Sequence, residues 1–257
     1  MVIIRAFWGD MSAFGGKYQK QIQDSLNENL NEIVYVWGKD NFKYLTNLGY
    51  TCELISEEEY NFDLASNHTF YDFKSLNHKL FVINRALQEW DEILFLDWDC
   101  KFVGELDNDF YRLLKEGSSL QIPLYTYPKK SLKWMIEKTN NEDVNPFFVK
   151  LNEVIQQYSY EWNSNYIIPN TGFIYCREPI DLLKISLENE LECLPDEFSV
   201  FMYAQKNKLT LEQYILKHEP KIIRGKLHEE DWWIQSENEF NKYVESLINK
   251  KIYFEHN

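Results

Sequence analysis

Two aspartates separated by one tryptophan, Asp97 and Asp99, follow the apolar run at residues 93–96. A short run of this kind is typical of a buried strand, which has no use for unpaired carboxylates at its end. Carboxylates at this spacing can reach one small region where the backbone bends, and Mg²⁺ or Mn²⁺ prefers such oxygen ligands. A metal ion held there can bind a diphosphate and stabilise its departure. The same pattern also fits a turn whose aspartates accept backbone N–H groups.

The overall charge bears on this choice. The chain of 257 residues has 27 Lys and Arg against 41 Asp and Glu, a formal net charge of −14. This composition argues against nucleic-acid binding, which depends on clustered Lys and Arg. An anionic small molecule would need local neutralisation by a metal ion or by a few placed cations. Aromatic residues make up 16% of the chain, and rings at a cleft suit flat ligands such as bases and sugars.

The elements around the aspartates indicate an α/β fold. Apolar runs alternate with amphipathic segments, as in βαβ units on a mostly parallel sheet. Strands are expected at 2–7, 32–37, 51–55, 92–99, 119–127 and 251–257, with a further strand pair over 166–176 that is broken at 169–172. Helices are expected at 17–29, 40–49, 73–90, 179–192, 210–219 and 237–250. Ligand-binding loops of such sheets lie beyond the carboxyl ends of the strands, where Asp97 and Asp99 fall. Tryptophan 98 should point away from them, as a packing residue.

Two stretches carry a family resemblance. "KLFVINRALQEWDEILFLDWDCKFVGELDNDF" at 79–110 and "PNTGFIYC" at 169–176 resemble the nucleotide-sugar-dependent glycosyltransferases of the GT-A fold, most closely the glycogenin-like retaining branch. The order of elements is similar over about residues 70–215. The resemblance implies a Rossmann-like, mixed and mostly parallel sheet flanked by helices. It implies one domain over 1–257, with a nucleotide-binding half at 1–125 and a sugar- and acceptor-binding half at 126–257.

The resemblance also implies roles for residues of both motifs. Asp97 would contact the ribose and a Mn²⁺ or Mg²⁺ ion, and Asp99 would ligate the ion that holds the donor diphosphate. Lys79 would contact the donor phosphates or sugar, although it also fits a solvated helix lysine, and Arg85 is the alternative cation. The segment Asn170, Thr171 and Gly172 would face the donor sugar, or form a simple turn.

Further roles follow from the same resemblance. Glu212 and Gln213 occupy the place of an Asp-Gln pair near the anomeric carbon, with one additional methylene in the acid. A third metal ligand is expected after the last strand, at His256, with His228 as the alternative. The loop after the first strand offers rings that could stack on a base or simply pack, namely Phe7, Trp8 and Tyr18.

The expected function is metal-dependent transfer of a sugar from a nucleoside diphosphate, with UDP implied by the resemblance, to an acceptor hydroxyl. Retention is favoured; inversion would need a base, with Glu212, Glu230 and Asp231 as candidates. The alternatives are a non-catalytic sugar-nucleotide-binding or scaffold protein and an aspartyl-phosphate phosphatase. The acceptor stays open. No apolar run approaches a membrane span and no signal peptide is evident, so we expect a cytoplasmic protein.

Overall fold

The computed structural model describes most of the first half of the chain and shorter parts of the second half. The described residues are 1–11, 13–26, 30–60, 73–102, 106–122, 136, 145–158, 171–188, 196–207, 222–224 and 254–256.

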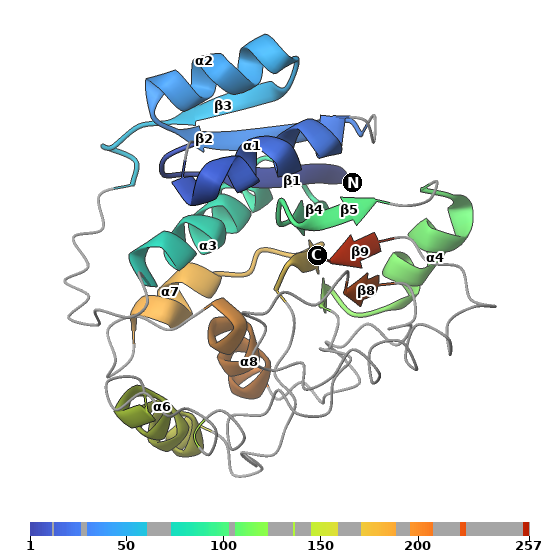
Figure 1. Cartoon of the computed structure of the whole chain (residues 1–257). Helices are drawn as coiled ribbons and strands as arrows, with labels where there is room; N and C mark the ends of the chain where they lie inside the picture. Colours follow the sequence, from blue (N-terminus) through green and yellow to red (C-terminus); the bar gives the residue numbers. More distant parts are fainter. Residues whose placement is uncertain are drawn as a thin grey trace, which may run out of the picture.

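Within the described residues, six strands form one mixed sheet in the order β3-β2-β1-β4-β7-β6, and Figure 1 labels the first four of these. Their bounds are Val2–Phe7 for β1, Glu32–Trp37 for β2, Thr51–Ile55 for β3, Ile93–Leu96 for β4, Leu120–Gln121 for β6 and Phe173–Cys176 for β7. The first four strands along the chain pair in parallel, whereas β7 runs antiparallel to both β4 and β6. The expected α/β fold with a mixed, mostly parallel sheet is confirmed.

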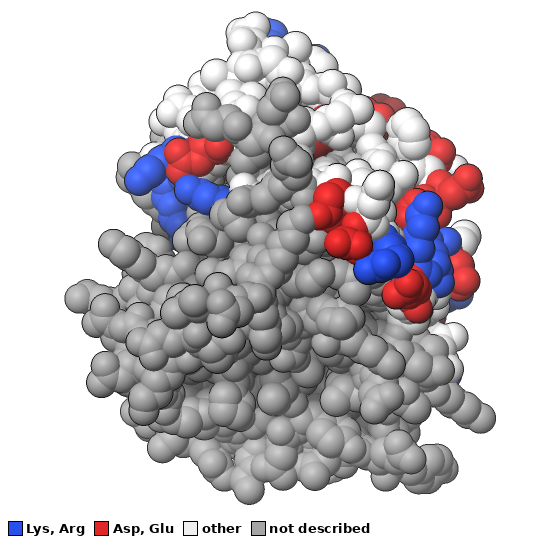
Figure 2. All heavy atoms as spheres, turned by 90° about the vertical axis from the view of Figure 1, so that its right-hand side faces the viewer, with Lys and Arg blue, Asp and Glu red and all other residues white. Residues whose placement is uncertain are grey.

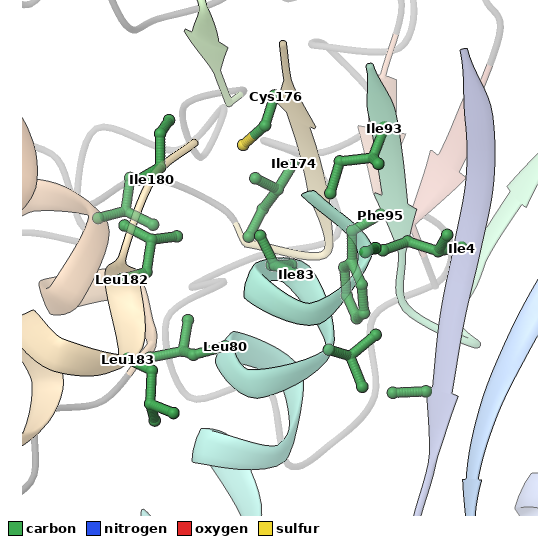
Figure 3. Packing of buried hydrophobic residues seen from close by; sticks show 14 of the residues in the cluster. Ile4, Leu80, Ile83, Ile93, Phe95, Ile174, Cys176, Ile180, Leu182 and Leu183 are labelled. Atoms are coloured by element: carbon green, nitrogen blue, oxygen red, sulfur yellow. The ribbon is translucent and has the colours of Figure 1, made fainter. Parts of the chain in front are cut away.

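Helices cover both faces of this sheet because alternate strand residues point to opposite sides. The helices are α1 (Ala13–Leu26), α2 (Lys39–Leu48), α3 (Phe73–Leu87), α4 (Asn108–Glu116), α6 (Asn145–Tyr158), α7 (Leu182–Leu187) and α8 (Asp196–Lys206). On one face α3, α7 and α8 share a buried cluster with the sheet, and Figure 3 labels its residues Ile4, Leu80, Ile83, Ile93, Phe95, Ile174, Cys176, Ile180, Leu182 and Leu183. On the opposite face α1 and α2 pack on β1 and β2, and α4 packs on β4 and β7.

A second, three-stranded sheet joins the end of the chain to the residues after the D-x-D motif. It contains β5 (Cys100–Phe102), β9 (Phe254–His256) and β8 (Ile222–Arg224), in the order β5-β9-β8. Strand β9 pairs antiparallel with β5, and Cys100 lies opposite His256. The last described strand therefore lies beside the motif, as Figure 1 shows.

The sequence-based elements agree best in the first half. Three of the described helices were not predicted, namely α4, α6 and α8. The helices expected at 210–219 and 237–250 lie outside the described residues, and the division into two halves stays a prediction. No helix in the described part of the chain is long and apolar enough to cross a membrane.

Charged side chains alternate in sign on one face of the molecule. Figure 2 shows Lys and Arg beside Asp and Glu on the described part of that face. Local ion pairs of this kind occur on α4, where Arg112 lies 3.0 Å from Asp109 and 3.7 Å from Glu116. Exposed pairs contribute little individually to stability.

The end of α2 supports a direct test of the backbone. Gly49 has φ +103°, and its N–H and that of Tyr50 donate to the carbonyls of Thr46 and Leu45. Gly49→Ala should lower the free energy of unfolding by about 1–2 kcal/mol in urea titrations, because a side chain disfavours left-handed backbone. A Cβ there would meet no atom within 4 Å, so the loss is conformational. Asn47→Ala, an exposed change in the same turn, is the control, and equal stability of both variants would contradict the prediction.

Candidate functional site

A cavity of about 310 Å³ lies beyond the carboxyl ends of β1 and β4. Its lining comes from the end of β1, from α1, from α3 and from the turn after β4: Ala6, Phe7, Trp8, Lys17, Tyr18, Gln21, Lys79, Asp97, Trp98 and Asp99. This is where α/β sheets commonly hold ligands. The structure thus brings together six of the residues that the sequence analysis names as candidates for the site, from four separate stretches of the chain.

The D-x-D motif forms a tight turn between β4 and β5. The N–H of Cys100 donates to the carbonyl of Asp97 at 3.0 Å, which reverses the chain direction within four residues. Both aspartates line the cavity. Trp98 is 8% exposed, and its indole N–H donates to the carbonyl of Ala6 at 2.7 Å. It packs against Phe7 and Tyr50, as expected of a packing residue, but it also lines the cavity beside the two aspartates instead of pointing away from them.

The ammonium group of Lys79 contacts three oxygens inside the protein. It lies 2.8 Å from Asp97 Oδ2, 2.7 Å from Asp196 Oδ2 and 3.2 Å from the carbonyl of Thr171. A lysine has three N–H donors, so these partners occupy all of them. The predicted contact of Lys79 with a donor molecule would require one of these bonds to be exchanged, and it stays a prediction.

The charges of this cluster are coupled. Burial raises the pKa of Asp97 to about 6, with Lys79 opposing the shift and Asp99 adding to it. Burial alone would raise the pKa of Asp196, but Lys79 and the hydrogen bonds to Asp196 hold that pKa below its ordinary value. Burial likewise disfavours the charged form of Lys79, yet the carboxylates of Asp196 and Asp97 raise its pKa. Three aspartates against one lysine leave the formal charge of the cluster negative, so a diphosphate would need an added cation.

Asp196 is the residue that sequence reasoning missed. It occupies the first turn of α8, is 5% exposed, and also accepts the Thr171 hydroxyl at 2.6 Å. The available signal was Pro195-Asp196-Glu197 directly before an apolar run, since proline and acidic residues mark helix starts. The sequence-based choice fell on Glu212 and Gln213, which lie outside the described residues.

The segment at 171–172, from the second motif of the resemblance, contacts the D-x-D motif where strand β4 ends. The N–H of Asp97 donates to the carbonyl of Gly172 at 2.8 Å, which extends the antiparallel pairing of β4 and β7. Thr171 is 3% exposed and turned towards Asp196. Asn170 lies outside the described residues. The two motifs named in the resemblance are therefore in contact, although whether Thr171 and Gly172 face a donor sugar stays a prediction.

Other predicted residues lie elsewhere or are only partly described. Arg85 does not line the cavity and pairs with Glu89 and Glu59 on the outside of α3. The backbone of His256 lies opposite Cys100, next to Asp99 in sequence, but its side chain is outside the described residues, as is His228. His256 as a metal ligand therefore stays a prediction.

The two carboxylates fit a hard divalent cation. Within the described residues no group of three or more His, Cys, Asp or Glu side chains is placed to hold a metal ion. Asp97 and Asp99 offer oxygen ligands in one cavity of negative formal charge, which suits Mg²⁺ or Mn²⁺. Remaining ligands would come from phosphate oxygens of a bound molecule, from water or from His256.

Aromatic rings form the wall towards β1. Phe7 is 2% exposed and packs edge-on against Tyr18 and Trp98. Trp8 is half-buried, and its ring stacks on His78 with centroids 5.2 Å apart and planes 14° apart. Burial, followed by the nearby charges of Asp99 and Asp97, raises the pKa of Tyr18. Of the three rings predicted to stack on a base or to pack, Phe7 is thus mainly a core residue, whereas Trp8 and Tyr18 keep some exposed surface.

No protein-family model matches the sequence, and no curated protein matches it. Solved structures do match. The crystal structure of mouse xyloside xylosyltransferase 1 in its apo form is similar over 100% of this chain and 97% of that chain, with a TM-score of 0.53 and 12% identity. The apo structure of WbbM, a bifunctional glycosyltransferase, is similar over 99% of this chain and 45% of that chain, with a TM-score of 0.56 and 13% identity. This chain thus spans less than half of WbbM. At such identities the likeness establishes a shared fold.

The ion pairs of Lys79 predict that replacing this lysine lowers the stability of the protein strongly. Lys79→Met should lower the free energy of unfolding by about 3 kcal/mol at neutral pH, because Asp196 would stay buried without its cation. Because the folded-state pKa of Asp196 is below its ordinary value of 3.8, the pair stabilises the fold above about pH 4 and less as the pH falls. The difference from the unsubstituted protein, measured in urea at pH 7, 4 and 3, should therefore shrink only as the pH falls below about 4.

Lys184→Met is the matched control for this measurement. Lys184 is 61% exposed and lies 3.9 Å from Glu188 on α7, so its loss should change stability by less than about 0.5 kcal/mol. Equal effects of the two substitutions would show that Lys79 contributes no more than a surface lysine.

Proposed function

We propose that this protein is a metal-dependent glycosyltransferase that moves a sugar from a nucleoside diphosphate, with UDP the expected nucleotide, to an acceptor hydroxyl. The observation that carries the proposal is the pair of aspartates in the cavity beyond β1 and β4, in a chain similar over nearly its whole length to two glycosyltransferase structures. Xylosyl transfer is the activity named for one of these proteins. The donor sugar and acceptor of this chain are left open.

Each residue of the site has a separate role in the proposed reaction. Asp97 and Asp99 would hold Mn²⁺ or Mg²⁺, which when bound supplies Lewis-acid stabilisation of the departing diphosphate. Lys79 restrains one oxygen of Asp97 at 2.8 Å, and the other carboxylate oxygen would be available to an ion. The carboxylate of Asp196 and the carbonyl of Thr171 accept the other hydrogen bonds of that lysine, and the Thr171 hydroxyl donates to Asp196. Trp8 would offer the base a partly exposed ring at the end of β1.

The carboxylates of the described site favour a retaining reaction. Asp97 and Asp99 are assigned to the metal ion. Asp196 accepts hydrogen bonds from Lys79 and Thr171, and its pKa is lowered, which makes it a weak proton acceptor. Among the described residues that line the cavity, this leaves no further carboxylate to act as the base that inversion requires. In a retaining reaction the leaving phosphate itself can take the proton of the acceptor.

A non-catalytic protein that binds a sugar nucleotide is the alternative, and turnover separates the two. Purified protein should release UDP from at least one of a panel of UDP- and GDP-sugars with MnCl₂, and EDTA should stop the release. A pure binder would raise its melting temperature with UDP and Mn²⁺ but release no UDP.

Asp99→Asn tests the metal assignment. UDP release should fall roughly 100-fold, since Lewis-acid stabilisation is worth several kcal/mol. Asp24→Asn is the control, because Asp24 pairs with Lys101 at 2.7 Å and does not line the cavity. Full activity of Asp99→Asn would remove the metal from the proposal.

The stereochemistry of the released sugar tests retention. With an active donor and no acceptor, ¹H NMR recorded before mutarotation should detect the free sugar with the anomeric configuration of the donor. The opposite anomer would require a protein base outside the described residues and would contradict retention.

A further inference from the structure

We infer that Arg5 is a positioning residue. Its side chain, on strand β1, binds the backbone of the D-x-D turn and so fixes the shape of the turn. Arg5 has no surface exposure at all, although it lies in the middle of strand β1. The assignment builds on the proposed function of the turn, but the contacts that carry it concern the protein alone.

The guanidinium group of Arg5 reaches both ends of the turn. Nη1 donates to the carbonyl of Asp97 at 2.7 Å and to the carbonyl of Cys100 at 3.3 Å. Nε donates to Glu32 Oε2 at 2.7 Å, and Glu32 is itself 5% exposed. The guanidinium carbon lies 5.1 Å from the ring centre of Trp98. One buried cation therefore contacts three of the four residues of the turn.

Burying a charged side chain costs desolvation free energy, and an apolar side chain could fill the same space in a buried strand without that cost. Arg5 and Glu32 lie on neighbouring strands β1 and β2, which pair in parallel. Arg5 reaches the carbonyls of Asp97 and Cys100 from β1, and the carbonyl of Asp97 also accepts the N–H of Cys100 within the turn. What an apolar residue cannot supply is a rigid, planar set of donors that binds two carbonyls at once.

Holding these carbonyls sets the direction of the aspartate side chains. The peptide on the amino side of Asp97 is fixed by the carbonyl of Gly172, and the peptide on its carboxyl side by Arg5. Trp98 is fixed by the carbonyl of Ala6. The Cα–Cβ bonds of Asp97 and Asp99 are therefore oriented towards the cavity before any ligand binds, as expected of groups that orient metal ligands.

Arg5→Lys is the decisive variant, because it keeps a cation for Glu32 but loses the planar donor set. The first measurement is hydrogen exchange of the amides of Asp97 and Cys100 in the protein without ligand, together with urea unfolding. The second is the affinity for Mn²⁺, measured from the free-ion signal in electron paramagnetic resonance. Arg177→Lys is the matched control, since Arg177 also donates to two backbone carbonyls, at Lys115 and Gly117, 2.8 Å and 2.7 Å away, outside the cavity.

The expected result is exchange at least about 10-fold faster at these two amides, beyond any change in global stability, and Mn²⁺ affinity about 10- to 100-fold lower. Arg177→Lys should change neither. Unchanged exchange at Asp97 and Cys100 in Arg5→Lys, or the same increase in Arg177→Lys, would overturn the assignment. If Arg5→Lys does not fold, Arg5→Met combined with Glu32→Leu removes both charges and is judged by the same exchange criterion.

The two proposals can fail separately. Absence of Mn²⁺ binding to the unsubstituted protein would contradict the metal-dependent function, while the exchange measurement would still decide the role of Arg5.

Discussion

The bond network around the ammonium group of Lys79 is the constraint on which the site depends. A buried lysine is tolerated only when anionic or polar partners surround it, and the partners of Lys79 come from three different parts of the chain. The turn after β4 supplies Asp97, the start of α8 supplies Asp196, and the segment before β7 supplies a carbonyl. Because α3 carries Lys79, this one cation connects α3 to the turn after β4 and to the start of helix α8.

Two cations act on the same turn from different directions. Lys79 binds a side-chain oxygen of Asp97 from the α3 face of the sheet, whereas Arg5 binds the backbone carbonyl of the same residue. Side chain and main chain are thus restrained independently. An arrangement of this kind keeps polar groups in place without relying on a ligand, which is the condition under which electrostatic stabilisation of a reacting group is most effective.

The strands of the first half, the position of the D-x-D motif and the packing of Trp98 could be predicted because each depends on local patterns of apolar and polar residues. Helix α8 could not, because it is buried on nearly all sides and its sequence lacks an amphipathic period. Asp196 was missed together with its helix. The contact between Arg5 and the turn was beyond prediction for another reason: it joins residues far apart in sequence through the register of three neighbouring strands. The occupancy of all three Lys79 donors is likewise a property of the assembled fold.

The pairing of β5 with β9 affects the order in which the site folds. Cys100 and His256 are separated by more than half of the 257 residues, yet they lie opposite each other beside the turn. Such long-range contacts close late and slow folding. During synthesis, a chain that has already formed β1 to β4 would leave β5, which directly follows the two aspartates, without its partner strand β9 until residues 254–256 emerge. Assembly of the region around the carboxylate site is therefore coupled to pairing with residues 254–256, rather than to folding of residues 1–102 alone.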